Sequence, residues 1–128
     1  MKRMTLAALA FLIATPAISD PVLGLYKARP GDDGKVGHGE LYRCGASGCG
    51  VIRKAIDASG AEIPSDNIGR RMIWNMQAQG DGAYGKGKIW APDRDKTYSS
   101  KMELSGNALK VSGCVLGICR AQNWTRVK

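Results

Sequence analysis

The chain has 128 residues, of which 44% are hydrophobic, and a formal net charge of +8. This length supplies one modest hydrophobic core, so we expect one domain rather than two. A basic balance can indicate nucleic acid as a partner, but the positive residues are scattered beyond the N-terminal segment, where the adjacent pairs are Arg53 with Lys54 and Arg70 with Arg71. No basic stretch carries the interleaved aromatic residues of a single-strand binding groove, which argues against nucleic-acid binding.

The N-terminal segment 1–19 has the pattern of a cleaved export signal. Lys2 and Arg3 precede an apolar run at 4–14 and a small-x-small cleavage site at 17–19. The apolar run is shorter than the roughly 20 residues that a membrane-spanning helix needs, and no later segment approaches that length. We therefore expect a periplasmic or secreted protein with no transmembrane segment after cleavage.

The mature protein would be a single domain at 20–128. Loss of Lys2 and Arg3 lowers the formal charge by two, from +8 to +6, so the mature domain stays basic. Outside the cytoplasm, such a charge favours an anionic component of the cell envelope, such as lipid headgroups or acidic polysaccharide.

Apolar and polar residues alternate along the mature chain, which is the period of a half-buried β-strand. The clearest case is 97–104, where Tyr98, Met102 and Leu104 share one face. The alternation continues at 109–115 after Ser105-Gly106-Asn107, a hairpin signal. The eight expected strands are 23–28, 39–44, 49–56, 71–77, 83–90, 97–104, 109–115 and 119–127.

The segments between the expected strands are short and rich in Gly, Pro and Asp, as at 29–34, 79–82 and 91–95. The segment 57–69 is irregular, and we interpret it as a long loop with a helical turn. Strands joined in sequence by short turns form an antiparallel meander, and a meander of eight closes into a barrel without exposed edges. The predicted fold class is all-β, an up-and-down barrel, with a sandwich as the alternative.

Four cysteines form two local pairs with the same spacing, Cys44 with Cys49 and Cys114 with Cys119. The four intervening residues suit a hairpin loop whose flanking residues face each other within disulfide reach. The same spacing permits a four-thiolate metal site, although an oxidising compartment and the absence of a nearby His favour disulfides. No Cys-x-x-Cys redox motif is present, and no cofactor is expected.

Most of the mature chain resembles a family of bacterial exported proteins, the domain of unknown function twenty-one forty-seven. The residues that carry the resemblance are KIWAPDRDKTY, the terminal QNWTRV and the first cysteine hairpin, LYRCGASGCGVI. The resemblance implies a small antiparallel barrel of the lipocalin-like kind, with no established activity. Such barrels often carry Gly-x-Trp on the first strand and an Arg near the end of the last. Gly24, Tyr26 and Arg126 are similar to that set, which implies that Arg126 packs over the Tyr26 ring where the barrel closes.

Methionine and aromatic residues at alternating positions are the candidates for a ligand pocket. We expect Met72, Trp74 and Met76 to share one face of their strand. Such a lining suits a promiscuous apolar pocket, whereas a filled core is the alternative, because an eight-stranded barrel has an interior that side chains can just fill. The predicted ligand-binding residues are Met72, Trp74, Met76, Trp90, Tyr98 and Met102.

Catalytic groups are sparse in this sequence. His38 is the only histidine, and we interpret it as a solvated residue in a Gly-rich turn rather than as a member of a catalytic triad. Asp93 and Asp95 are more typical of turn caps than of an acid/base pair. The first hypothesis is therefore a non-enzymatic barrel that binds a small apolar or amphiphilic ligand. The second is an envelope interaction module that uses its basic surface on an anionic partner.

Overall fold

The computed structural model describes residues 20–31 and 33–127, and the expected export signal lies outside these residues. A 3-10 turn, η1 (Asp20–Val22), precedes the strands. The strands of the described residues are β1 (Gly24–Lys27), β2 (Val36–Cys44), β3 (Ser47–Ile56), β4 (Glu62–Ile63), β5 (Arg71–Gly80), β6 (Ala83–Ala91), β7 (Lys96–Ser105), β8 (Ala108–Val115) and β9 (Ile118–Arg126). All of the predicted strands are present.

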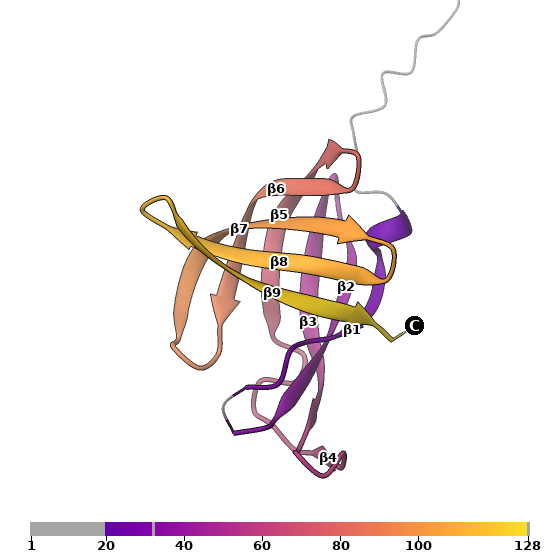
Figure 1. The fold of residues 1–128 in the computed structure, drawn as a ribbon, viewed down its shortest axis with the longest axis vertical. Coiled ribbons are helices and arrows are strands. Elements are labelled where there is room, and N and C mark those ends of the chain that lie inside the picture. The colour runs from indigo at the N-terminus through magenta and orange to yellow at the C-terminus, as the bar shows by residue number, and fades with distance from the viewer. Residues whose placement is uncertain (1–19, 32, 128) are drawn as a thin grey trace, which may run out of the picture.

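The sheet is antiparallel and closes on itself, as Figure 1 shows. Neighbouring strands follow the order β2-β1-β9-β8-β7-β6-β5-β3-β4, and β2 also pairs with β3. This last pairing closes the predicted barrel. The short strand β4 adds to β3 through Ala55 and Ile56, so the segment interpreted as a loop also contains a two-residue strand. A hydrogen-bonded turn follows at 66–69.

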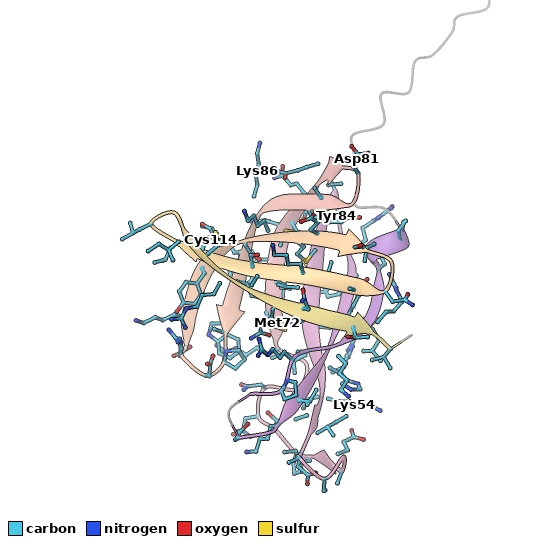
Figure 2. The ribbon with its side chains drawn as sticks, viewed as in Figure 1. Lys54, Met72, Asp81, Tyr84, Lys86 and Cys114 are labelled. Carbon is cyan, nitrogen blue, oxygen red and sulfur yellow. A yellow bond between two sulfur atoms is a disulfide. The ribbon has the colours of Figure 1, made fainter. Side chains whose placement is uncertain are left out.

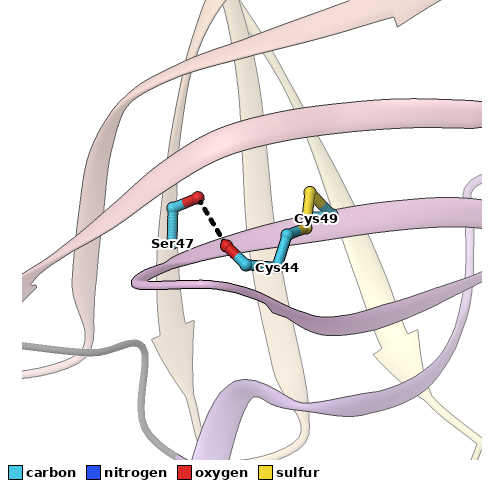
Figure 3. Close-up of a disulfide and its surroundings, with 3 residues drawn as sticks. All are labelled: Cys44, Ser47 and Cys49. Carbon is cyan, nitrogen blue, oxygen red and sulfur yellow. Dashed lines mark hydrogen bonds between the residues drawn. A yellow bond between two sulfur atoms is a disulfide. The ribbon is translucent and has the colours of Figure 1, made fainter.

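Both predicted disulfides are present, each across a hairpin. The Cα atoms of Cys44 and Cys49 are 5.8 Å apart across the β2–β3 turn, and those of Cys114 and Cys119 are 4.1 Å apart across the β8–β9 turn. In the first hairpin, Ser47 Oγ donates a hydrogen bond of 3.2 Å to the Cys44 carbonyl (Figure 3). The two disulfides exclude a four-thiolate metal site.

The alternation expected along β5 is wrong at one point. Ile73 and Met76, three residues apart, are both buried, whereas Trp74 is only half-buried. The cause is a paired irregularity in which Asn75 on β5 and Lys86 on β6 have φ values of 56° and 58°. A residue in the left-handed region bends its strand and changes which face the next side chain occupies. Met72, Trp74 and Met76 therefore do not share one face.

The barrel interior holds one cluster of buried side chains. Its members are Val22, Tyr26, Leu41, Ile73, Met76, Tyr84, Met102, Leu109, Val111 and Trp124. Met76 is 0% exposed and Met102 is 3% exposed. A chamber large enough for a ligand would leave side chains accessible to a water-sized probe. The low exposure therefore shows that this section of the barrel is packed.

Gly87 makes room for Met76 in this core. A Cβ atom on Gly87 would lie 2.7 Å from Met76 Cε and 3.1 Å from the Trp74 carbonyl oxygen. The strand opposite thus lacks a side chain where the Met76 side chain ends. This fit is typical of close packing in protein interiors.

The barrel closes where β1 meets β9. The Arg126 guanidinium lies 4.9 Å from the centroid of the Tyr26 ring, which is the packing that the resemblance implies. Arg126 Nη2 donates to Tyr26 Oη over 2.7 Å, and Tyr26 Oη donates to the Val22 carbonyl over 2.9 Å. Arg126 also donates to the carbonyls of Leu23 and Pro21. Burial raises the pKa of the Tyr26 hydroxyl, so this group stays a neutral donor.

Candidate functional site

The six predicted ligand-binding residues do not line one chamber. Met76 and Met102 are members of the packed core, and Met72 is half-buried and packs against it (Figure 2). Trp74, Trp90 and Tyr98 lie outside that cluster. The structure thus divides the set into three methionines in or against the core cluster and three aromatic residues outside that cluster.

Two of these aromatic rings are covered by arginines. The Arg70 guanidinium is 3.5 Å from the centroid of the Trp90 ring, and that of Arg71 is 5.5 Å from the centroid of the Trp74 ring. Trp90 Nε1 also donates a hydrogen bond of 2.8 Å to Asp95 Oδ1. Asp95 is therefore committed to a structural contact, as expected of a turn residue, and Trp90 is occupied by neighbours from its own chain.

The interpretation of His38 as a solvated turn residue is wrong. His38 lies within β2, and its Nδ1 atom is buried without a hydrogen-bond partner among the described residues. Burial lowers the pKa of the imidazole, and the positive charges of Lys54 and Lys27 lower it further. In a catalytic triad an acidic group accepts a hydrogen bond from one ring nitrogen of the histidine. Among the described residues, Nδ1 of His38 has no such partner.

A hollow lies on the outer surface of the barrel. It has a volume of about 320 Å³ and crosses the middle of β6 and β7 to the end of β8. Buried Gly87 and Ser100 form its floor, and exposed side chains form its walls. The lining residues are Lys86, Gly87, Lys88, Ser99, Ser100, Lys101 and Cys114.

Three ammonium groups give this lysine hollow its chemistry. Lys86, Lys88 and Lys101 are all exposed, and within the described residues none of them forms an ion pair. Lys88 Nζ donates to Ser99 Oγ over 3.3 Å, which places a hydroxyl beside the cations. Unpaired ammonium groups with a nearby hydroxyl are donors suited to phosphate, sulfate or carboxylate oxygens.

The register of the sheet extends the lysine hollow to the last hairpin. Lys88 is directly opposite Ser99, Ser99 is opposite Cys114, and Cys114 is opposite Cys119. A second hollow of about 150 Å³ adjoins it and is lined in part by Lys101, Lys110 and Glu103. Positive residues that are scattered along the sequence thus come together on this face, where lysines from three strands gather beside Glu103.

Sequence reasoning missed the lysine hollow for a physical reason. The alternation along 97–104 does place Lys101 on the polar face, and Lys86 and Lys88 are two residues apart. However, only the cross-strand register brings these positions together, and register depends on pairings between distant segments.

Two further features of the described residues bear on function. None of their helices has the length and apolar character needed to cross a bilayer. Nor do three or more His, Cys, Asp or Glu side chains gather there as a metal-binding group would require.

Comparison with known proteins places this fold in a class and then in a family. A solved structure described as "Protein HP1028 from the human pathogen Helicobacter pylori belongs to the lipocalin family" is similar, with a TM-score of 0.67 and 15% sequence identity over 84% of this chain and 83% of that chain. This likeness supports a lipocalin-like barrel. Residues 24–126 match the model of the family "Uncharacterized protein conserved in bacteria (DUF2147)", so the chain belongs to that family. No curated protein matches the chain significantly.

Proposed function

We propose that this protein is an exported, non-enzymatic binding module whose basic outer surface over β6, β7 and β8 binds an anionic partner of the cell envelope. The observation that carries the proposal is the lysine hollow, a space of about 320 Å³ lined by three lysines that form no ion pair with the described residues. Electrostatic attraction between this surface and an anionic partner favours binding and raises the association rate.

The packed interior favours a binding site on the outer surface of the barrel over a pocket inside it. Met76 and Met102, two of the residues predicted to bind a ligand, are buried and belong to the core. An internal ligand would have to displace these side chains, which would sacrifice packing energy. A ligand on the outer surface requires no such rearrangement.

Binding to a soluble polyanion, such as dextran sulfate, tests this proposal. The affinity is expected to fall as salt is raised, because exposed charges are screened, and to fall further when the three lysines are neutralised. Binding that is absent or insensitive to salt would contradict the proposal.

A small apolar or amphiphilic ligand remains the second candidate. The observation that favours it is that Trp74 and Tyr98 are half-buried and lie outside the packed cluster, while Met72 is half-buried at its margin. These side chains would supply apolar contacts at the edge of the barrel.

Native mass spectrometry of the protein recovered from its producing cell tests both this candidate and export. A co-purified mass that dissociates on activation would support the ligand, and a chain beginning at Asp20 would support cleavage of the export signal. A consistently empty protein would contradict the apolar ligand, and a retained segment 1–19 would contradict cleavage.

A further inference from the structure

The tip of the β8–β9 hairpin is the most exposed apolar feature of the described residues. Val115 is 53% exposed, Leu116 is 98% exposed and Ile118 is 73% exposed. Figure 1 shows this hairpin extending past the wall of the barrel, and the Cys114–Cys119 disulfide closes its base. The apolar tip (Val115, Leu116 and Ile118) is therefore held away from the core that would normally bury such side chains.

Leu116 is unfavourable in its position for two separate reasons. It has a φ of 51° and is followed by Gly117 with a φ of 79°, which defines a two-residue turn with positive φ at both central positions. Such turns favour Asn-Gly, because a leucine there clashes with its own backbone. The second cost is the nearly complete exposure of an aliphatic side chain to water. With Leu116 98% exposed, contacts with the rest of the described chain offset little of either cost.

Positive charge adjoins the apolar tip on its β7 side and along β9. Cys114, at the base of the tip, also lines the lysine hollow with Lys86, Lys88 and Lys101. Arg120 follows the tip on β9 and is exposed. An apolar projection beside unpaired cations is complementary to an anionic bilayer, in which phosphates lie above the hydrocarbon.

A second copy of this chain is less well matched to this surface. The residues of β9 from Ile118 to Asn123 are exposed, and β9 pairs with β1 only at Thr125 and Arg126. This open edge could pair with another strand. A second copy would, however, bring together two surfaces of the same positive sign, with like charges opposed.

We propose that the apolar tip inserts into the outer layer of an anionic phospholipid bilayer while the lysine hollow binds phosphate headgroups. This inference rests on the proposed function and names its partner. The disulfide keeps the tip extended, and the lysines supply attraction that three aliphatic side chains alone would lack. A single apolar anchor gives marginal and reversible membrane binding, so two contributions are needed.

Co-sedimentation with phospholipid vesicles tests the insertion. The probe is a vesicle of equal parts phosphatidylglycerol and phosphatidylcholine, with pure phosphatidylcholine as the uncharged comparison. Leu116→Asn removes the apolar side chain and supplies the Asn-Gly pair that the turn prefers, so the hairpin should still fold. Transfer of a leucine side chain from water to the bilayer raises the partition coefficient about 10-fold or more. We therefore expect Leu116→Asn to bind the charged vesicles at least roughly 10-fold more weakly.

The matched control is Val127→Asn, which removes an exposed apolar side chain just after the C-terminal end of β9. Its binding should equal that of the unchanged protein. A second readout is a Leu116→Trp variant, whose additional fluorescence should be quenched by brominated lipid chains. Equal binding by Leu116→Asn and Val127→Asn, or an unquenched tryptophan, would overturn the insertion.

Other results separate the insertion from the proposed function. Binding to dextran sulfate without binding to charged vesicles would overturn the membrane inference and leave the anionic partner standing. If the unchanged protein bound neither dextran sulfate nor charged vesicles, both the proposed function and the membrane inference would be overturned. A dimer of the unchanged protein that Leu116→Asn converts to a monomer would assign the tip to a second copy and overturn the membrane inference.

Discussion

Replacing Lys86, Lys88 and Lys101 together by glutamine is expected to weaken binding to anionic vesicles or to dextran sulfate by about 100-fold. Each lysine near an anionic surface contributes about 1 kcal/mol, and three such contributions correspond to about two decades in the dissociation constant. The loss should be largest at low salt and should shrink as screening increases. Binding isotherms at two salt concentrations provide the measurement.

The fold should tolerate this triple substitution. The three side chains are exposed and form no ion pair among the described residues, so their loss leaves no buried charge without a partner. The matched control replaces Lys27, Lys54 and Lys96, which are also exposed, and produces the same net charge. An equal loss of binding in the two variants would show that total charge, rather than the lysine hollow, governs binding.

Truncation of Met76 to alanine is expected to destabilise the barrel by about 2 to 5 kcal/mol, the usual cost of deleting a large buried side chain. Met76 is completely buried and ends where Gly87 leaves space for it, so the substitution would open a cavity. Urea unfolding followed by tryptophan fluorescence measures the change. Met72→Ala, at a half-buried position, should cost less.

The same experiment separates a packed barrel from an open one. Should Met76→Ala fail to fold, the volume-conserving Met76→Leu should remain folded, because such exchanges usually cost less than about 1.5 kcal/mol. If Met76→Ala instead unfolded at the same urea concentration as the unchanged protein, and the unchanged protein took up an apolar dye, the interior would be open.

The strands and disulfides were predictable because their signals are local. The alternation along 97–104 extends over one strand, and the Gly-containing turn that follows predicts a hairpin without reference to the rest of the chain. The cysteine pairs are also local, because a hairpin alone brings Cys114 and Cys119 together.

The failed predictions concern features that depend on distant contacts. The sequence around Asn75 and Lys86 contains no signal that predicts their positive φ values. Yet these two residues shift the alternation of buried and exposed side chains along β5, and Met76 lies in the core as a result. The burial of the His38 Nδ1 atom likewise depends on the strands β1 and β3, which pair with β2 on either side. The lysine hollow required the register between β6 and β7, which is set by the whole sheet rather than by either strand.

Chemical-shift mapping with glycerol phosphate tests most directly whether binding occurs on the outer surface. The ligand carries the headgroup phosphate without an apolar chain, so it isolates the contribution of the lysine hollow. We predict that the amide signals of Lys86, Lys88, Ser99 and Lys101 shift with increasing ligand while the methyl signals of the packed core remain in place. Shifts confined to the methyl groups of Met76 and Met102, with the lysine hollow unchanged, would contradict the account.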